Sequence, residues 1–120
     1  MNLGPTSEAL EYAREGKHEQ AVALVTRILA NHPDCPYLLV LRALTIQMQQ
    51  STDGPTLADA EDSLLRALDV DKTYLPALEE LAHFYDSVTS DRIRARVFAT
   101  RYLEIVLPIV KEMQKIADDR

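Results

Sequence analysis

The sequence predicts an all-α fold in a single domain, residues 1–120. Apolar residues recur at spacings of three and four along most of the chain, as they do on one face of a helix. No segment alternates polar and apolar residues in the manner of a strand. Only three glycines occur among 120 residues, which are too few for the many turns of a β-sandwich or barrel. A chain of this length can bury a workable core without disulfides.

Two helices are expected before residue 32. The first carries an apolar stripe of Ala9, Tyr12 and Ala13, and Gly16 is a natural place for it to end. The second should run from about His18 to Asn31. Its apolar face consists of Ala21, Leu24, Val25, Ile28 and Leu29.

The third helix, from about Pro36 to Gln50, is apolar almost all round, so it requires neighbours on several sides. A loop at Ser51–Thr56 should follow it. Thr56 and Asp59 have the spacing of a capping box, in which each residue's side chain binds the backbone N–H of the other. The fourth helix then continues to about Val70.

A fifth helix is expected within Tyr74–Tyr85, with Thr73 as its cap and Pro76 in its first turn. A break at Ser87–Ser90 should precede a sixth helix, capped by Thr89 or Ser90. Pro108 either kinks this sixth helix or begins a seventh. The apolar face of the fifth helix consists of Leu78, Leu81, Ala82 and Tyr85.

Small residues recur along the chain with a nearly constant period. In the first helix of each pair, Ala9 and Ala43 lie 34 residues apart, and Ala82 follows 39 residues later. In the second helices the corresponding residues are Ala21, Ala60 and Ala95, at intervals of 39 and 35. One insertion of five residues between Ala43 and Ala60, at the predicted loop, accounts for both long intervals.

This period, together with Leu78, Ala82 and Tyr85 in the fifth helix, resembles the tetratricopeptide repeat. The resemblance implies a right-handed superhelical stack of three helix hairpins, at about residues 3–33, 34–72 and 73–108. A C-terminal capping helix would occupy residues 109–118, covering the apolar end of the array. The third repeat departs from the pattern, because Ala99 and Tyr102 replace the usual aromatic and small residues.

Repeats of this kind usually turn the first helix of each hairpin toward a concave groove. The resemblance therefore implies a partner-binding groove of Leu10, Arg14, Tyr37, Val40, Leu44, Gln47, Met48, Glu79, His83 and Asp86. Val40, Leu44 and Met48 form an apolar stripe separate from that of Leu39, Ala43 and Ile46. An apolar stripe beyond the one needed for packing could bind the apolar side of an amphipathic helix or of an extended peptide. The alternative is that the centre of a small array is buried on all sides or covered by a terminal segment.

Some members of the family hold the C-terminal carboxylate of heat-shock chaperones with cationic and amide side chains. The corresponding positions here are Thr6, Leu10, Leu41, Pro76 and Glu80. None of these side chains is a cation, so this particular activity is not expected.

The sequence contains no catalytic motif, so we do not expect an enzyme or a cofactor. His32 and Cys35 supply only two donors at one helix junction, and a zinc site needs three or four. Neither catalytic nor metal-binding residues are therefore assigned.

Charge and composition restrict the partners and the compartment. The net charge of −6 argues against nucleic acid, whose binders carry a basic excess. The longest apolar run, Tyr37–Leu41, is too short to cross a membrane. Cys35 is the one cysteine of the sequence, and no signal peptide is evident, so we expect a reducing, cytoplasmic environment.

We therefore expect a non-catalytic protein–protein interaction module, an adaptor or scaffold that binds a peptide or an amphipathic helix. A small secretion-type or assembly chaperone for a helical partner is one alternative. A structural homo-oligomer, such as a homodimer built through Ile109, Met113 and Ile116, is another. Four arginines of the sixth helix form a solvated face or contact an acidic partner or a phosphate; they are Arg92, Arg94, Arg96 and Arg101.

Overall fold

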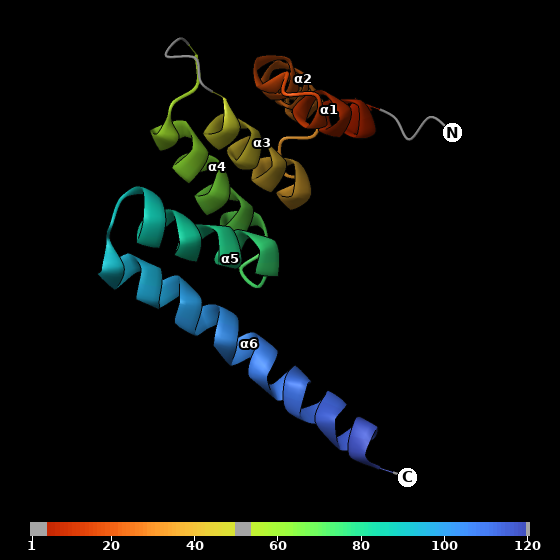
Figure 1. The fold of residues 1–120 in the computed structure, drawn as a ribbon, viewed down its shortest axis with the longest axis vertical. Helices are drawn as coiled ribbons and strands as arrows, with labels where there is room; N and C mark the ends of the chain where they lie inside the picture. Colours follow the sequence, from red (N-terminus) through yellow and green to blue (C-terminus); the bar gives the residue numbers. More distant parts are fainter. Residues whose placement is uncertain (1–4, 50–53, 120) are drawn as a thin grey trace. The chain divides into compact units, whose positions relative to one another are not determined.

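The computed structural model describes residues 5–49 and 54–119, and these residues form helices and turns without a strand (Figure 1). The prediction of an all-α fold is confirmed. Residues 50–53, which contain the end of the predicted third helix and the first half of the predicted loop, lie outside the described residues. The helices are α1 (Pro5–Arg14), α2 (His18–Asn31), α3 (Pro36–Met48), α4 (Leu57–Val70), α5 (Leu75–His83), the π-helical turn η1 (Phe84–Val88) and α6 (Arg92–Asp118).

The chain divides into two compact units, Met1–Lys72 and Thr73–Arg120. In the first unit each helix packs on the next along the chain, α1 on α2, α2 on α3 and α3 on α4. In the second unit α5 and η1 pack on α6. Within each unit, helices that follow one another in the sequence therefore pack against one another.

Local signals in the first unit behave as predicted. Gly16 has a φ of +78°, a conformation that residues with a side chain rarely adopt, and it follows the end of α1. At the start of α4 the Thr56 N–H donates to Asp59 Oδ2 at 2.7 Å, and the Asp59 N–H donates to Thr56 Oγ1 at 3.4 Å. The predicted capping box is thus present.

The helix α3 is buried over most of its surface, because α2 and α4 both pack against it. Its buried residues are Leu38, Leu39, Val40, Leu41, Ala43, Thr45 and Ile46. The one buried hydroxyl among them, that of Thr45, donates to the Leu41 carbonyl oxygen at 3.0 Å. The side chain of Arg42 connects α3 to the helices on both sides of it. It donates to Ser63 Oγ on α4 at 2.8 Å and to Thr26 Oγ1 on α2 at 3.2 Å.

An aromatic cluster holds α5 and η1 against α6 in the second unit. The rings of Tyr85 and Phe98 stack with their centroids 5.6 Å apart, and Phe84 meets Tyr85 edge to face. The guanidinium groups of Arg94 and Arg101 lie over the Tyr85 and Phe98 rings, at 5.5 and 5.3 Å from their centroids. The exposed side of this aromatic contact is thus covered by cations.

The boundaries predicted for the second unit were partly wrong. The N-cap of α5 is Tyr74 and not Thr73, so that Pro76 takes the second helical position, where no N–H is needed. The cap of α6 is Asp91, whose Oδ1 accepts the Arg94 N–H at 3.1 Å. Ser90 has a φ of +54° and turns the chain, so it cannot serve as that cap.

The helix α6 is continuous for 27 residues and passes through Pro108 without starting a new helix. The predicted capping helix at 109–118 is therefore the C-terminal part of α6. At 1.5 Å per residue α6 is about 40 Å long, whereas α5 and η1 together are about 21 Å long. Its C-terminal half consequently extends beyond α5 (Figure 1) and covers no other helix of its unit.

The alanines that carried the repeat spacing are mostly buried where helices approach one another. Four of them have no exposed surface: Ala9, Ala21, Ala43 and Ala60. Ala95 is buried as well, but Ala82 is only half-buried. The helix crossing expected at Ala82 is therefore looser than the sequence indicated.

Replacing Ala43 by leucine should lower the free energy of unfolding by about 1–3 kcal/mol, because three added carbons cannot be accommodated in a filled core. Chemical denaturation followed by circular dichroism measures the change. Ala58 is exposed near the start of α4 and supplies the matched control. Ala58→Leu should alter stability little, and equal effects of the two substitutions would place Ala43 outside the tight crossing.

Replacing Thr56 by alanine should cost about 1 kcal/mol of stability through loss of the α4 cap. Hydrogen bonds from the Thr56 backbone N–H and hydroxyl keep the pKa of Asp59 below its usual 3.8. A lowered carboxyl pKa stabilises the fold above that range, and the contribution is lost as the pH falls through the folded-state pKa. Unfolding curves at pH 7 and below pH 4 should therefore show a smaller difference between variant and wild type in acid. If the stability difference between variant and wild type were the same at both pH values, the Asp59 carboxylate would not contribute to the stabilisation by the cap.

Candidate partner-binding surfaces

The predicted groove residues of the first unit lie on α1 and α3. Leu10 is half-buried, and Arg14 is exposed and forms a surface ion pair with Glu11, with Nη1 and Oε2 3.3 Å apart. An exposed pair of this kind contributes little to stability, so Arg14 can exchange Glu11 for an acidic group of a partner at small cost.

On α3 the predicted residues separate into surface and core. Tyr37 and Met48 are exposed over 47% and 45% of their surface, and Leu44 between them is half-buried. These three side chains fall within about 40° of one another around the helix, at 100° per residue. Val40 is buried and belongs to the core, and Gln47 donates to the Ala43 carbonyl oxygen at 3.2 Å. We call Tyr37, Leu44 and Met48 the α3 stripe.

The other predicted residues, Glu79, His83 and Asp86, are exposed in the second unit. Their neighbour Glu80 is half-buried, and burial raises the pKa of its carboxyl group, although the nearby His83 partly opposes the shift. Glu79 and Glu80 follow one another on α5, so this surface is acidic before the arginines of α6 are considered.

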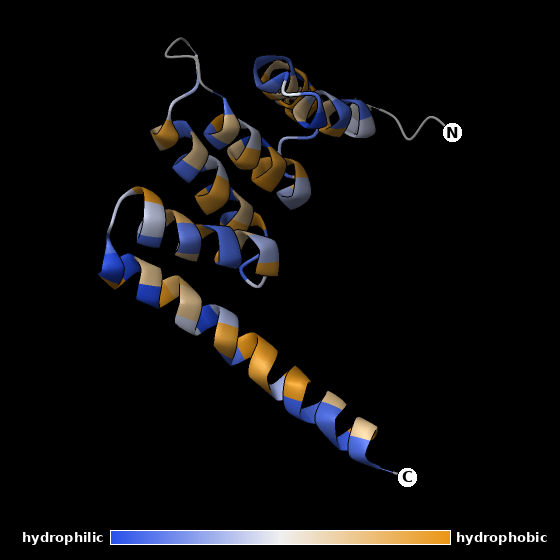
Figure 2. Ribbon diagram, in the orientation of Figure 1, coloured by the Kyte–Doolittle hydropathy of each residue, from blue (hydrophilic) through white to orange (hydrophobic). Residues whose placement is uncertain are grey.

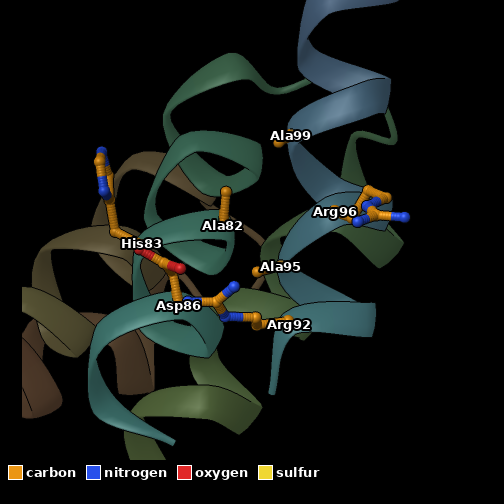
Figure 3. Close-up of a pocket in the computed structure, with 7 residues that line it drawn as sticks. All are labelled: Ala82, His83, Asp86, Arg92, Ala95, Arg96 and Ala99. Carbon is orange, nitrogen blue, oxygen red and sulfur yellow. The ribbon is translucent and has the colours of Figure 1, made fainter. Parts of the chain in front are cut away.

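His83 and Asp86 line an open pocket of about 510 Å³ between α5 and α6. Figure 3 shows small side chains from both helices at its walls, with Asp86 and Arg92 at one end and Ala99 at the other. We call it the α5–α6 pocket; its lining residues are Ala82, His83, Asp86, Arg92, Ala95, Arg96 and Ala99. Two arginines against one aspartate make its rim basic.

On α6 the pocket is lined by two alanines, Ala95 and Ala99, that lie four residues apart. Ala99 follows Ala95 by four residues, as Val25 follows Ala21 and Leu64 follows Ala60. Val25 and Leu64 are completely buried and fill the space beside their helix, whereas the methyl group of Ala99 leaves it open. Sequence reasoning noticed Ala99 only as a departure from the repeat and did not predict the pocket, although the signal was present.

A second hollow, of about 370 Å³, lies among α2, α3 and α4 and surrounds Arg42. Hydrogen bonds between its lining residues connect Arg42 to Thr26 and to Ser63. A further bond at its edge runs from Arg66 Nη2 to the Pro33 carbonyl oxygen, at 3.1 Å. These side chains use its polar groups to join helices, so its role is structural.

The C-terminal half of α6 is rich in apolar residues, which Figure 2 shows in orange along the ribbon, and several of their side chains are exposed. Ile109, Met113 and Ile116 are exposed over 52%, 54% and 61% of their surface. Exposed alongside them are Leu103, Leu107 and Val110. A helix that is apolar on several sides requires a cover in water.

Among the residues described, no three histidine, cysteine or acidic side chains converge in a way that could hold a metal ion. His32 and Cys35 lie in one turn, where the Cys35 N–H donates to the His32 carbonyl oxygen at 3.3 Å. None of the described helices is both long and apolar enough to cross a bilayer.

Comparison of the chain with protein-family models, with curated proteins and with solved structures gives no match. The case for any function therefore depends on the residues and their geometry.

Proposed function

We propose that this chain is a non-catalytic protein-interaction module of three tetratricopeptide-like hairpins, α1–α2, α3–α4 and α5–α6. It binds an amphipathic helix or an extended peptide of another protein along the α3 stripe. The observation that carries the proposal is the exposure of Tyr37 and Met48 on a helix whose other sides are packed by α2 and α4. Because Cys35 is the one cysteine, we place the protein in the reducing cytoplasm.

The packing of neighbouring helices supports the hairpin part of this proposal. Each helix of the first unit contacts the next, and the alanines at the predicted positions of both hairpins are fully buried. Two hairpins of this kind share a continuous core that neither could form alone. The first helix of the second hairpin, α3, is the one that would face the groove of such an array.

The chemistry of the α3 stripe supports the choice of ligand. Tyr37 combines a rigid apolar ring with a hydroxyl, and Met48 adapts its flexible side chain to irregular surfaces, so both are suited to interfaces. Leu44 between them is already half-buried and needs only a shallow apolar side chain from the partner. Burial of these groups supplies the affinity, while Arg14 on α1 would orient a partner that carries an acidic residue.

An adaptor and an assembly chaperone would use the same surface, since both hold a helical segment of another chain. The two differ in whether the partner depends on this protein for its solubility. Production of a captured partner alone and together with this protein would separate them, because only a chaperone's partner should precipitate when produced alone.

The double variant Tyr37→Gln/Met48→Gln should lose partner capture. Loss of two apolar contacts, at about 1.4 kcal/mol for the pair, corresponds to about a tenfold weaker association. The measurement is affinity capture from an extract of the source cells, with quantification of each protein enriched by the wild-type chain. Circular dichroism should show unchanged helicity, because both side chains are exposed.

The matched control is Leu57→Gln/Val70→Gln, which replaces two comparably exposed apolar residues at the ends of α4. This control should capture the same proteins as the wild type. If the α3 variant and the control behaved alike, the α3 stripe would not be the binding surface.

A further inference from the structure

We propose that two copies of this chain form a symmetric dimer in which the end of α6 of each copy fills the α5–α6 pocket of the other. We call residues 105–118 the α6 tail. The two α6 helices would lie antiparallel, with a two-fold axis beside Val106. The proposal uses only the second unit, so it does not depend on partner binding along the α3 stripe.

The α6 tail has a face prepared for helix packing. Phe98 lies on the side of α6 that stacks on Tyr85 of η1, and spacings of three and four continue this side through Tyr102, Ile105, Ile109, Met113 and Ile116. Phe98 is buried, whereas the last three residues are more than half exposed. The face that α5 covers at the start of α6 is thus left uncovered where α5 ends.

The α5–α6 pocket offers the matching surface. Its walls carry Ala82, Ala95 and Ala99, and methyl groups at these positions permit another helix to approach closely. Its volume of about 510 Å³ is large enough for several apolar side chains. A helix inserted there would occupy the space that Val25 and Leu64 fill beside the other alanines.

Both surfaces lie on one helix, and this decides how two copies can combine. With the axis beside Val106, residues equally far before and after it lie opposite one another. Met113 of one copy then lies opposite Ala99 of the other, and Ile109 lies opposite the exposed Leu103. The contact occurs twice, and a two-fold arrangement closes on itself without leaving a free surface for further copies.

Charge favours this antiparallel arrangement over a parallel one. Residues 92–101 carry four arginines and no acidic residue, whereas residues 111–120 are neutral, with Glu112, Asp118 and Asp119 against two lysines and Arg120. The antiparallel dimer places this neutral segment against the arginines of the other copy and brings Asp118 near Arg96 at the basic rim of the pocket. Parallel pairing would place the arginines of both copies together, which is unfavourable.

Light scattering during size-exclusion chromatography of the full chain, over a range of concentrations, tests the dimer. The wild type should have twice the 13.5 kDa mass of one chain. Met113→Lys/Ile116→Lys should reduce it to one chain mass, because added cations fit neither the apolar walls of the pocket nor its basic rim. Both side chains are exposed and lie outside the buried core, so the helices before the α6 tail should stay folded in this variant.

The matched control is Ile93→Lys/Val97→Lys, which replaces two exposed apolar residues on another side of the same helix. This variant should remain a dimer. A wild type of one chain mass at every concentration would overturn the proposal, as would a dimer that survives the tail substitutions.

A charge exchange tests the antiparallel arrangement. Arg96→Glu should weaken the dimer severalfold, since the lost contact occurs twice, and Asp118→Arg in the same chain should restore it. Failure of the second change to restore the dimer would exclude the antiparallel contact. Tail variants should still capture proteins through the α3 stripe, so loss of the dimer and loss of capture are distinguishable.

Discussion

The close approach of helices at alanine is the constraint on which the first unit depends. Ala9, Ala21, Ala43 and Ala60 have no exposed surface, and a methyl group is the largest side chain that such crossings accommodate. Close approach alone leaves gaps on either side of the crossing, which larger neighbours such as Leu64 fill. A small residue and a large one, four positions apart, therefore act together in each hairpin of this unit.

The second unit has the same pairing of a small and a second residue four positions apart, but the second residue is small as well. Ala95 takes the place of the small residue, but Ala99 stands where a large one is needed, and the α5–α6 pocket is the space left over. The aromatic cluster of Tyr85 and Phe98 holds the hairpin together at the other side of α6. The contact between η1 and α6 thus uses other side chains than those that line the pocket.

Local signals explain how much of this could be predicted from the sequence. The bounds of α2 and the capping box of Thr56 and Asp59 depend on residues within a few positions, and both predictions are confirmed. The predictions that failed depend on more distant contacts. The cap of α6 is Asp91 and not Ser90, because the turn that follows η1 ends one residue later than predicted. The backbone N–H of Asp91 donates to the Tyr85 carbonyl oxygen of η1 at 2.7 Å. Likewise, periodicity grouped Val40 with Leu44 and Met48, and only the packing of α3 shows that Val40 is buried.

The continuation of α6 through Pro108 connects the helix itself to its uncovered face. A proline inside a helix removes one hydrogen bond and crowds the preceding turn, at a cost of about 3 kcal/mol. The ten residues that follow are also fewer than the roughly 12–15 that form even a marginal isolated helix in water. The α6 tail therefore needs packing energy to remain helical, and α5 is too short to supply it. Its exposed apolar face is the natural source of that energy, so whatever covers Ile109, Met113 and Ile116 also maintains the helix that presents them.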